Sequence, residues 1–154
     1  MVRVQDGDSL LVRPENGDKA VRIRLHGIDA PEKGYAGRWE PQPYCIRAQE
    51  LLAELLPVGT TVAVAEYGKD RYGRVLAGIV RLPDGLVVQE ELLERGLAWV
   101  FKRYCKGCDT FETLEDQARE NSLGVWSQEP VPPWEWRKAA KALRQKKSME
   151  LAEE

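Results

Sequence analysis

An alternating run of apolar and polar side chains at 21–26 constrains the fold more than any other feature of the sequence. The run reads Val-Arg-Ile-Arg-Leu-His, which is the period-two pattern of a strand buried on one face. An Asn-Gly pair at 16–17 separates it from the apolar residues at 10–12. Asn-Gly between two such runs indicates a tight hairpin, so we expect the chain to begin with antiparallel β-structure.

The following segment mixes strand and helix patterns. Apolar spacing predicts these elements in order: a helix over 48–56, strands over 61–65 and 74–80, a short helix over 88–93 and a third helix over 114–120. The run at 75–80 is apolar on both faces, so we expect that strand to be covered on both sides. With 154 residues, the chain has room for one ordinary domain and a tail. The predicted fold class is α+β, a small antiparallel sheet or barrel with three helices.

The composition changes after Trp126. Three prolines at 130, 132 and 133 cannot lie inside a helix, and the Trp-Glu-Trp at 134–136 is expected to anchor an arm onto the domain. A basic helix is predicted over 137–149. We therefore divide the chain into a domain at 1–126 and a C-terminal arm with a helical tail at 127–154. The basic tail has two interpretations, an extended nucleic-acid contact or a solvated helix face, and the second is the commoner case.

The charge balance limits how the chain can bind a polyanion. There are 23 Lys and Arg against 25 Asp and Glu, for a formal net charge of −2. A long-range basic field is therefore excluded, and any nucleic acid must be bound by a few placed cations. No apolar run approaches the ~20 residues needed to span a bilayer, and no signal peptide is recognised at the start.

The three cysteines and the single histidine have several interpretations. The odd cysteine count excludes a dense disulfide framework. Cys105 and Cys108 could form a bridge, Cys45 could pair with one of them, or all three could be free thiols. A redox pair lacks the expected βαβ context, and a zinc site lacks ligands. His26 lies near candidate catalytic residues, where a general base is possible, but a structural role is favoured.

Three short clusters carry the residues that suggest chemistry. They are Asp-Gly-Asp at 6–8, the stretch from Arg to Glu at 24–32, and Asp-Arg-Tyr-Gly-Arg at 70–74. Taken singly, they are typical of a turn, a loop and a hairpin entry. Together they contain what phosphodiester hydrolysis requires, namely oxygen ligands for a hard cation, a base for water, and planar cations that grip phosphate oxygens.

Each requirement has a candidate in these clusters. Asp8 and Asp29 can supply a metal site, and Glu32 can act as the base. Arg24 and Arg74 can clamp the phosphate. In a regular strand, residues five apart point to opposite faces, but a Gly and a Pro interrupt the 24–32 stretch, so its side chains can converge.

The order of the motifs resembles the staphylococcal nuclease (thermonuclease) family. The matching stretches are Asp-Gly-Asp-Ser at 6–9, Arg-Leu-His-Gly-Ile-Asp-Ala-Pro-Glu at 24–32, Asp-Arg-Tyr-Gly-Arg at 70–74, Glu-Glu-Leu-Leu-Glu-Arg-Gly-Leu-Ala-Trp-Val at 90–100 and Glu-Asp-Gln-Ala-Arg-Glu-Asn-Ser-Leu-Gly-Val-Trp at 115–126. The resemblance implies an OB-fold, a five-stranded β-barrel carrying three helices, to which this chain adds the Pro/Trp arm and basic helix. It also implies a Ca²⁺-dependent (calcium-dependent) nuclease acting on single-stranded DNA and RNA and leaving 3′-phosphate and 5′-hydroxyl ends. We expect a monomer, secreted or membrane-tethered outside the cytoplasm in a longer precursor.

The resemblance also implies a role for individual residues. The implied calcium ligands are the carboxylates of Asp8 and Asp29 and the backbone carbonyl of Ala30, with Asp6 a further carboxylate near the metal. The implied catalytic residues are Arg24, Glu32 and Arg74. The implied substrate contacts are Arg71, Tyr72 and Tyr104.

The chain also departs from the family pattern. Ala30 stands where a Thr is usual, Lys102 replaces an aromatic in the base-binding rim, and the loop at 33–42 does not align. Two other functional classes are weighed against the nuclease. One is a noncatalytic nucleic-acid- or protein-binding module on the same fold, which typically loses the acidic and arginine positions retained here. The other is a thiol-based redox protein.

Overall fold

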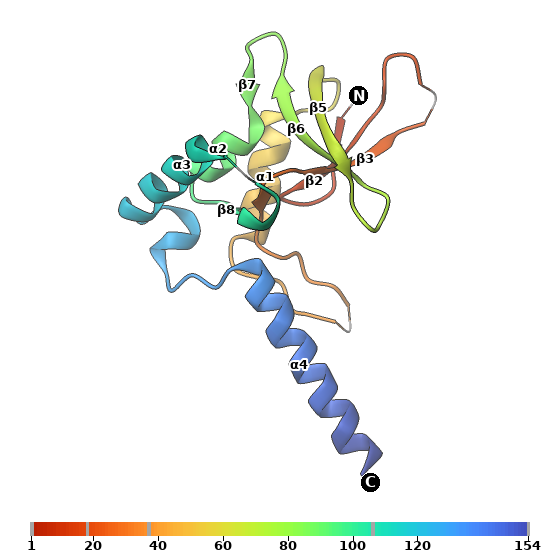
Figure 1. Ribbon diagram of the computed structural model, residues 1–154, viewed down its shortest axis with the longest axis vertical. Helices are drawn as coiled ribbons and strands as arrows, with labels where there is room; N and C mark the ends of the chain where they lie inside the picture. Colours follow the sequence, from red (N-terminus) through yellow and green to blue (C-terminus); the bar gives the residue numbers. More distant parts are fainter. Residues whose placement is uncertain (1, 18, 37, 106, 154) are drawn as a thin grey trace.

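The computed structural model describes residues 2–17, 19–36, 38–105 and 107–153, and it has the expected α+β character. Within these ranges the elements are β1 (Val2–Val4), β2 (Ser9–Val12), β3 (Val21–Leu25), β4 (Ile28–Asp29), α1 (Cys45–Leu55), β5 (Val62–Lys69), β6 (Val75–Arg81), β7 (Leu86–Val87), α2 (Val88–Glu94), β8 (Trp99–Val100), the 3-10 helix η1 (Lys102–Tyr104), α3 (Asp109–Glu120), the 3-10 helix η2 (Gly124–Ser127) and α4 (Pro133–Ala152). Figure 1 shows the sheet on one side of the body, α1, α2 and α3 beside it, and α4 projecting away from both.

The main sheet has the strand order β1-β2-β3-β6-β5, with β7 beside β6. The predicted hairpin is confirmed, because β2 and β3 pair antiparallel with Ser9 opposite Arg24 and Val12 opposite Val21. The expectation of a purely antiparallel sheet is wrong at one place. β3 pairs parallel with β6, with Arg24 opposite Leu76. This pairing brings the start of β6 next to the strand that carries Arg24.

The strand pairing also differs from the expected five-stranded barrel. The main sheet contains six strands, and among the described residues β1 and β5 stand at its two ends without pairing to each other. β4 and β8 form a separate two-stranded sheet, with Ile28 opposite Val100 and Asp29 opposite Trp99. The cause is the turn after β3, where Gly27 adopts a φ of 82°. This left-handed conformation, which suits glycine, directs the chain away from the main sheet.

Three elements have a boundary that differs from the sequence prediction by at least four residues. β5 continues to Lys69, beyond the predicted end at 65, because a bulge between Glu66 and Gly68 accommodates an irregular stretch within the strand. α3 begins at Asp109, where acidic residues in the first turn favour the helix N-terminus. α4 begins at Pro133 and includes the predicted anchor. Proline is well accommodated at the first helical position because its missing N–H would lack a partner there anyway.

The core lies between the main sheet and helices α1 and α2. Its largest fully buried side chains are Leu10, Ile23, Leu25, Ile28, Leu51, Leu52, Leu56, Ile79, Leu92, Leu93 and Gln89. The expectation that β6 is covered on both faces is only partly met. Its residues alternate between buried and partly buried positions until the strand's last two, which are both partly buried. The second face is therefore less enclosed than the first.

Two glycines fix the end of α2 against η2. Gly96 and Gly124 have φ values of 70° and 54°, and the backbone N–H of Val125 donates to the Gly96 carbonyl at 2.9 Å. A Cβ on Gly96 would lie 2.2 Å from the Leu123 carbonyl oxygen. Glycine is therefore required at position 96 by both its backbone conformation and the close approach of the chain.

A short arm connects this joint to α4. The arm runs from 128 to 132 and returns toward the loop that precedes α1, where Tyr44 and Ser127 share a hydroxyl hydrogen bond of 2.7 Å. Among the described residues, no helix combines the length and apolar character needed to cross a membrane. The division into a domain at 1–126 and a tail at 127–154 stays a prediction.

Candidate active site

The Asp-Gly-Asp turn is held by its first carboxylate. Asp6 Oδ1 accepts the backbone N–H of Asp8 at 3.1 Å and the Ser9 hydroxyl at 2.6 Å. A Cβ on Gly7 would lie 2.8 Å from the Cβ atoms of Ala30 and of an alanine in α1. Only a glycine allows this loop to press against α1 and the residue that follows β4, and that contact positions Asp8.

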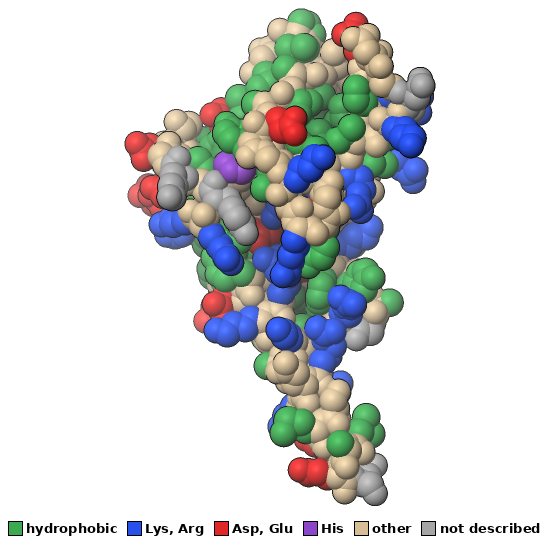
Figure 2. Space-filling model, turned by 45° about the vertical axis from the view of Figure 1, so that its right-hand side comes forward, with side chains coloured by type: hydrophobic (Ala, Val, Ile, Leu, Met, Phe, Trp, Pro, Cys, Tyr) green, Lys and Arg blue, Asp and Glu red, His purple; other side chains and the backbone are tan. Residues whose placement is uncertain are grey.

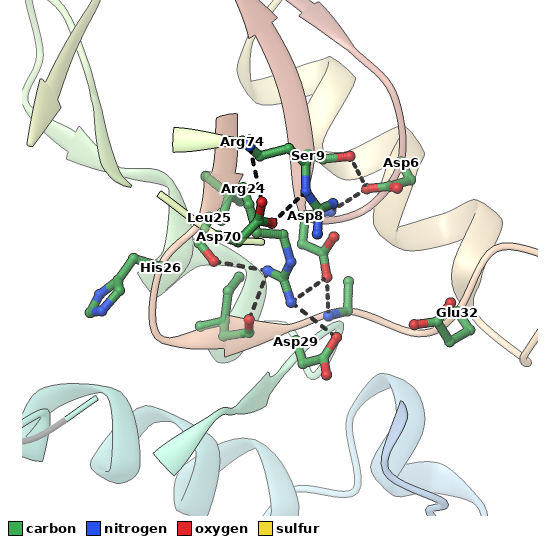
Figure 3. Close-up of polar contacts among 12 residues, drawn as sticks. Asp6, Asp8, Ser9, Arg24, Leu25, His26, Asp29, Glu32, Asp70 and Arg74 are labelled. Carbon is green, nitrogen blue, oxygen red and sulfur yellow. Dashed lines mark hydrogen bonds and ion pairs between the residues drawn. The ribbon is translucent and has the colours of Figure 1, made fainter. Parts of the chain in front are cut away.

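Arg24 joins the two predicted metal carboxylates, as Figure 3 shows. One terminal nitrogen, Nη1, donates to the carbonyls of Leu25 at 2.8 Å and Ile28 at 2.9 Å. The other, Nη2, lies 3.2 Å from Asp29 Oδ1 and 3.4 Å from Asp8 Oδ2. The carbonyls of the turn thus orient the guanidinium, whose second edge faces both carboxylates.

Burial makes these charges depend on one another. Asp8 Oδ2 also accepts the backbone N–H of Ala30 at 2.8 Å. Burial raises the pKa of Asp8, Arg24 partly counteracts this, and Asp29 adds to it. Burial alone would lower the pKa of Arg24, but Asp8 and Asp29 outweigh it and hold that pKa above its usual value. Burial, with a smaller contribution from Asp8, raises the pKa of Asp6 to about 6.

Glu32 lies to one side of the Arg24 group in Figure 3. Its backbone N–H donates to Gln42 Oε1 at 2.9 Å, and its carbonyl accepts the Gln42 backbone N–H at 2.8 Å. Burial raises the pKa of the Glu32 carboxyl, and a hydrogen bond from Arg137 opposes that rise. Gln42 belongs to the loop at 33–42 that does not align with the family pattern, and no motif in the sequence indicates its role.

Arg137 is the site residue that sequence reasoning missed. It lies in the first turns of α4, where its Nη2 is 2.9 Å from Asp29 Oδ2 and its Nη1 donates to Glu32 Oε1. The sequence placed it in a basic tail with five other cations. Its position directly after the Trp-Glu-Trp anchor was the one available signal, because an anchored arm fixes the residue that follows it.

Arg74 makes an ion pair that includes none of the other candidates. Its partner is Asp70, whose Oδ2 lies 2.7 Å from Arg74 Nε, and Figure 3 draws this pair beside Arg24 and Asp8, with Glu32 farther away. Tyr72 is 60% exposed, with the Arg71 guanidinium 5.0 Å from its ring centre. The side chain of Tyr104 lies outside the described part of the structure. The structure therefore brings together the implied metal and base residues but leaves the second arginine on a separate ion pair.

The cluster of Asp8, Arg24, Asp29 and Glu32 is called the pocket below, and its donor set suits a hard cation. Asp8 and Asp29 present carboxylate oxygens within reach of one guanidinium, and hard divalent cations prefer such oxygens. In the described ranges, no group of three or more His, Cys, Asp or Glu side chains is arranged to hold a metal ion. The implied calcium ligands are two carboxylate side chains and one backbone carbonyl, so they contain fewer than the three side chains that define such a group. Two guanidinium groups, Arg24 and Arg137, supply positive charge at these carboxylates.

The histidine and the cysteines are engaged in packing or in a disulfide bond. The His26 ring stacks on Tyr67 with the ring centres 4.1 Å apart, in agreement with the favoured interpretation. Cys105 and Cys108 form a disulfide, one of the alternatives considered, and Cys45 is a buried free thiol. The bridge packs against the turn after β3, since a Cβ on Gly27 would lie 2.7 Å from Cys105 Sγ.

Comparisons with known proteins identify the family of the chain. Residues 22–128 match the family described as staphylococcal nuclease homologue. An uncharacterized endonuclease of Escherichia coli is 42% identical over 139 residues, covering 89% of this chain and 82% of that protein. A micrococcal nuclease of Shigella flexneri is 34% identical over 150 residues, covering 92% and 80%. A staphylococcal-like nuclease of Arabidopsis thaliana is 39% identical over 121 residues, covering 78% of this chain and 34% of that protein. With a family match over most of its length and relatives of this similarity, the chain belongs to the staphylococcal nuclease family.

Proposed function

We propose that this protein is a Ca²⁺-dependent nuclease that hydrolyses phosphodiester bonds of single-stranded DNA and RNA and leaves 3′-phosphate and 5′-hydroxyl ends. The observation that carries the proposal is the buried Arg24 guanidinium between Asp8 and Asp29, with Glu32 three positions after Asp29 and joined to it through Arg137. The names of the relatives, which include an endonuclease and a micrococcal nuclease, support nuclease activity in general.

Asp8, Asp29 and the backbone carbonyl of Ala30 would hold the calcium ion. When bound, the cation supplies positive charge that offsets the negative charge developing on the phosphoryl oxygens. Ala30 has no side-chain hydroxyl to add a contact, so the two carboxylates provide all the side-chain oxygens in this set.

Glu32 acts as the general base in this mechanism. A raised pKa makes a carboxylate a stronger proton acceptor, and burial raises the pKa of Glu32. Its backbone is fixed by Gln42 through two hydrogen bonds, so the carboxylate is presented from a rigid loop. The carboxylate takes a proton from the attacking water as the water adds to phosphorus.

The arginines stabilise the charge of the transition state. Arg24 is preorganised, because two carbonyls orient its guanidinium before any substrate arrives. Arg74 leaves its ion pair with Asp70 and binds the substrate phosphate instead. Its side chain is 26% exposed in that ion pair, so the substrate can reach it. Arg71 and Tyr72 are exposed beside it and contact a neighbouring phosphate, while Tyr104 lies beside the base. Figure 2 shows Lys and Arg side chains gathered over one face of the body, which is the kind of surface that a polyanion needs.

The test is cleavage of heat-denatured DNA and single-stranded RNA by purified protein in Ca²⁺ and then in excess chelator. We expect cleavage in Ca²⁺ and none in chelator. We also expect that polynucleotide kinase labels the products without prior phosphatase treatment, because their 5′ ends carry hydroxyl groups. Binding without cleavage would instead identify the noncatalytic module, and cleavage unaffected by chelator would remove the metal from the mechanism.

A further inference from the structure

A cation from the C-terminal helix already occupies the carboxylates of the pocket. Arg137 Nη2 lies 2.9 Å from Asp29 Oδ2, Nη1 lies 3.4 Å from Asp29 Oδ1, and Nη1 also donates to Glu32 Oε1. Asp29 Oδ1 is shared with Arg24 at 3.2 Å. Both oxygens of Asp29 therefore accept hydrogen bonds from guanidinium groups, and one of the two, Oδ1, accepts from both arginines.

The arm holds Arg137 in this position from both sides. The Trp136 indole N–H donates to the carbonyl of Glu40 at 2.9 Å, and Gln42 Nε2 donates to the carbonyl of Val131. Gln42 also binds the backbone of Glu32. The loop that carries the base and the arm that carries Arg137 are thus joined by the same buried glutamine, so the placement follows from backbone contacts as well as charge.

The Arg137 side chain has a route out of the pocket. It is 33% exposed, whereas the Asp29 side chain with which it pairs is 2% exposed. A cavity of about 510 Å³ lies between the arm and β8, lined by Trp99, Phe101, Trp126, Pro130, Pro132 and Trp134 among others. The arm is therefore incompletely packed against the domain. Because a third of the Arg137 side chain already faces solvent, its guanidinium can rotate away from Asp29 without displacing a close-packed core.

Arg137 neutralises charge that would otherwise be buried without compensation. Among the described residues, the acidic groups of the pocket are Asp6, Asp8, Asp29 and Glu32, and the basic groups bonded to them are Arg24 and Arg137. A buried carboxylate requires a paired cation or a metal. A divalent cation and the Arg137 guanidinium meet the same need at Asp29, so binding of one weakens binding of the other.

We propose that Arg137 is an internal counter-ion that competes with the divalent cation for Asp29 and Glu32, so that the C-terminal arm sets the affinity of the pocket for its metal. The inference rests on the proposed function, because it takes the cation site to be the one formed by Asp8 and Asp29. In the metal-free protein the guanidinium closes the pocket. When the cation binds, the Arg137 side chain moves into solvent.

The test is isothermal titration of Ca²⁺ into metal-free full-length protein, comparing wild type with Arg137→Gln. A pocket blocked by Arg137 for nine-tenths of the time would bind the cation about tenfold more weakly than an open one. We therefore expect Arg137→Gln to bind Ca²⁺ about tenfold more tightly than wild type. Arg137→Lys, which keeps the charge but loses the planar fork, is expected to bind with intermediate affinity.

The matched control is Lys138→Gln, which removes the same charge from the next, exposed position of α4. Its affinity should stay within about twofold of wild type, because an exposed charge is screened by solvent and salt. Asp29→Asn should abolish the heat of binding and show that the titrated site is the pocket. Thermal unfolding gives a second readout, in which metal-free Arg137→Gln melts below wild type and gains more from added Ca²⁺.

Two results would overturn the proposal in distinguishable ways. If Arg137→Gln bound Ca²⁺ no more tightly than Lys138→Gln, the competition would be wrong while the cation site remained. If neither wild type nor Arg137→Gln bound Ca²⁺ in a manner that Asp29→Asn abolished, the cation site of the proposed function would fail as well.

Discussion

Asp8 and Asp29 are two nearly inaccessible carboxylates that share one guanidinium. Their residues are 8% and 1% exposed, and Arg24 lies within 3.4 Å of both. Breaking a buried ion pair by removing one partner typically costs about 3–5 kcal/mol, because the other charge is left uncompensated. Folding places these groups together although burial raises the pKa of Asp8 and so disfavours its charged form. Such an arrangement is typical of a functional site.

Glu32 carries the first prediction at the residue scale. Glu32→Ala should lower kcat on single-stranded DNA by at least about 10²-fold, because a general base typically contributes about 10²–10⁴. The variant should remain folded, since the hydrogen bonds to Gln42 come from the Glu32 backbone. Steady-state kinetics in Ca²⁺, with circular dichroism as the folding check, give the measurement.

Glu40→Ala is the control for this change. Glu40 lies in the same loop and is exposed, and its backbone carbonyl, which the substitution keeps, accepts the Trp136 indole N–H. Its kcat should stay close to that of wild type. Near-full turnover by folded Glu32→Ala would show that another group accepts the proton.

At the scale of elements, two-residue strands determine where the Asp29 carboxylate lies. β4 carries Asp29 and pairs with β8. α3 in turn holds β8, because Glu115 Oε2 accepts the backbone N–H of Val100 at 2.6 Å. The position of Asp29 therefore depends on a helix that begins 80 residues later in the chain.

The joint between α2 and η2 carries the prediction at this scale. Gly96→Ala and Gly85→Ala both place a Cβ at a left-handed position, with φ values of 70° and 76°. This conformation alone should cost about 1–2 kcal/mol. At Gly85 a Cβ meets nothing within 4 Å, whereas at Gly96 it lies 2.2 Å from the Leu123 carbonyl oxygen. Overpacking should add about 1–3 kcal/mol or more.

Chemical denaturation in urea measures both variants. We expect the free energy of unfolding to fall clearly more for Gly96→Ala than for Gly85→Ala. Equal losses in the two variants would mean that the contact between α2 and η2 does not constrain position 96.

At the scale of the whole molecule, a net charge of −2 coexists with a local gathering of cations. Figure 2 shows Lys and Arg side chains over the middle of one face and along α4 below it. Long-range attraction of a polyanion is therefore weak, and affinity depends on individual contacts. The proposed phosphate contacts are Arg24, Arg71 and Arg74.

These three contacts predict a shallow salt dependence. Each phosphate contact on a single strand contributes about 0.7 to the slope of log affinity against log salt, so the slope should be about −2. Replacing the exposed Lys141, Lys146 and Lys147 of α4 by Gln should leave this slope unchanged, because charges on an exposed helix face are more often solvated than bound to phosphate. Fluorescence anisotropy with labelled single-stranded DNA in Ca²⁺, with Glu32→Ala as the background that limits cleavage, gives both slopes. A shallower slope in the triple variant would place α4 on the substrate path.

Local features of the sequence predicted much of the fold and the pocket. The hairpin between β2 and β3 followed from the Asn-Gly pair and the alternating run. The proximity of Arg24 and Asp29 followed from a glycine and a proline that interrupt a short stretch of chain. In both cases the interacting residues are close in sequence, and the local conformation determines the contact.

The remainder depends on contacts distant in sequence that no local pattern encodes. β4 and β8 are too short to show a periodicity, so their pairing and the open edge of the main sheet were not predicted. Arg137 meets Asp29 across 108 positions. Its placement depends on the path of the arm and on Gln42, whose buried amide resembles any loop glutamine in the sequence. The family resemblance identified the roles of Arg24, Glu32 and Arg74 as predictions, but not the residue that closes the pocket.

The most direct test of the central claim is the single-turnover cleavage rate of single-stranded DNA in Ca²⁺ for Arg24→Ala against Arg22→Ala. Both arginines belong to β3, but Arg22 is exposed and donates to the Tyr72 carbonyl, whereas Arg24 lies between the carboxylates. Removing a preorganised charged donor typically costs about 10²–10³ in rate. We predict a loss of at least that size for folded Arg24→Ala, or for Arg24→Lys if the alanine variant does not fold, and a rate close to wild type for Arg22→Ala. A folded Arg24 variant that cleaved as fast as Arg22→Ala would contradict the assignment of this pocket as the active site.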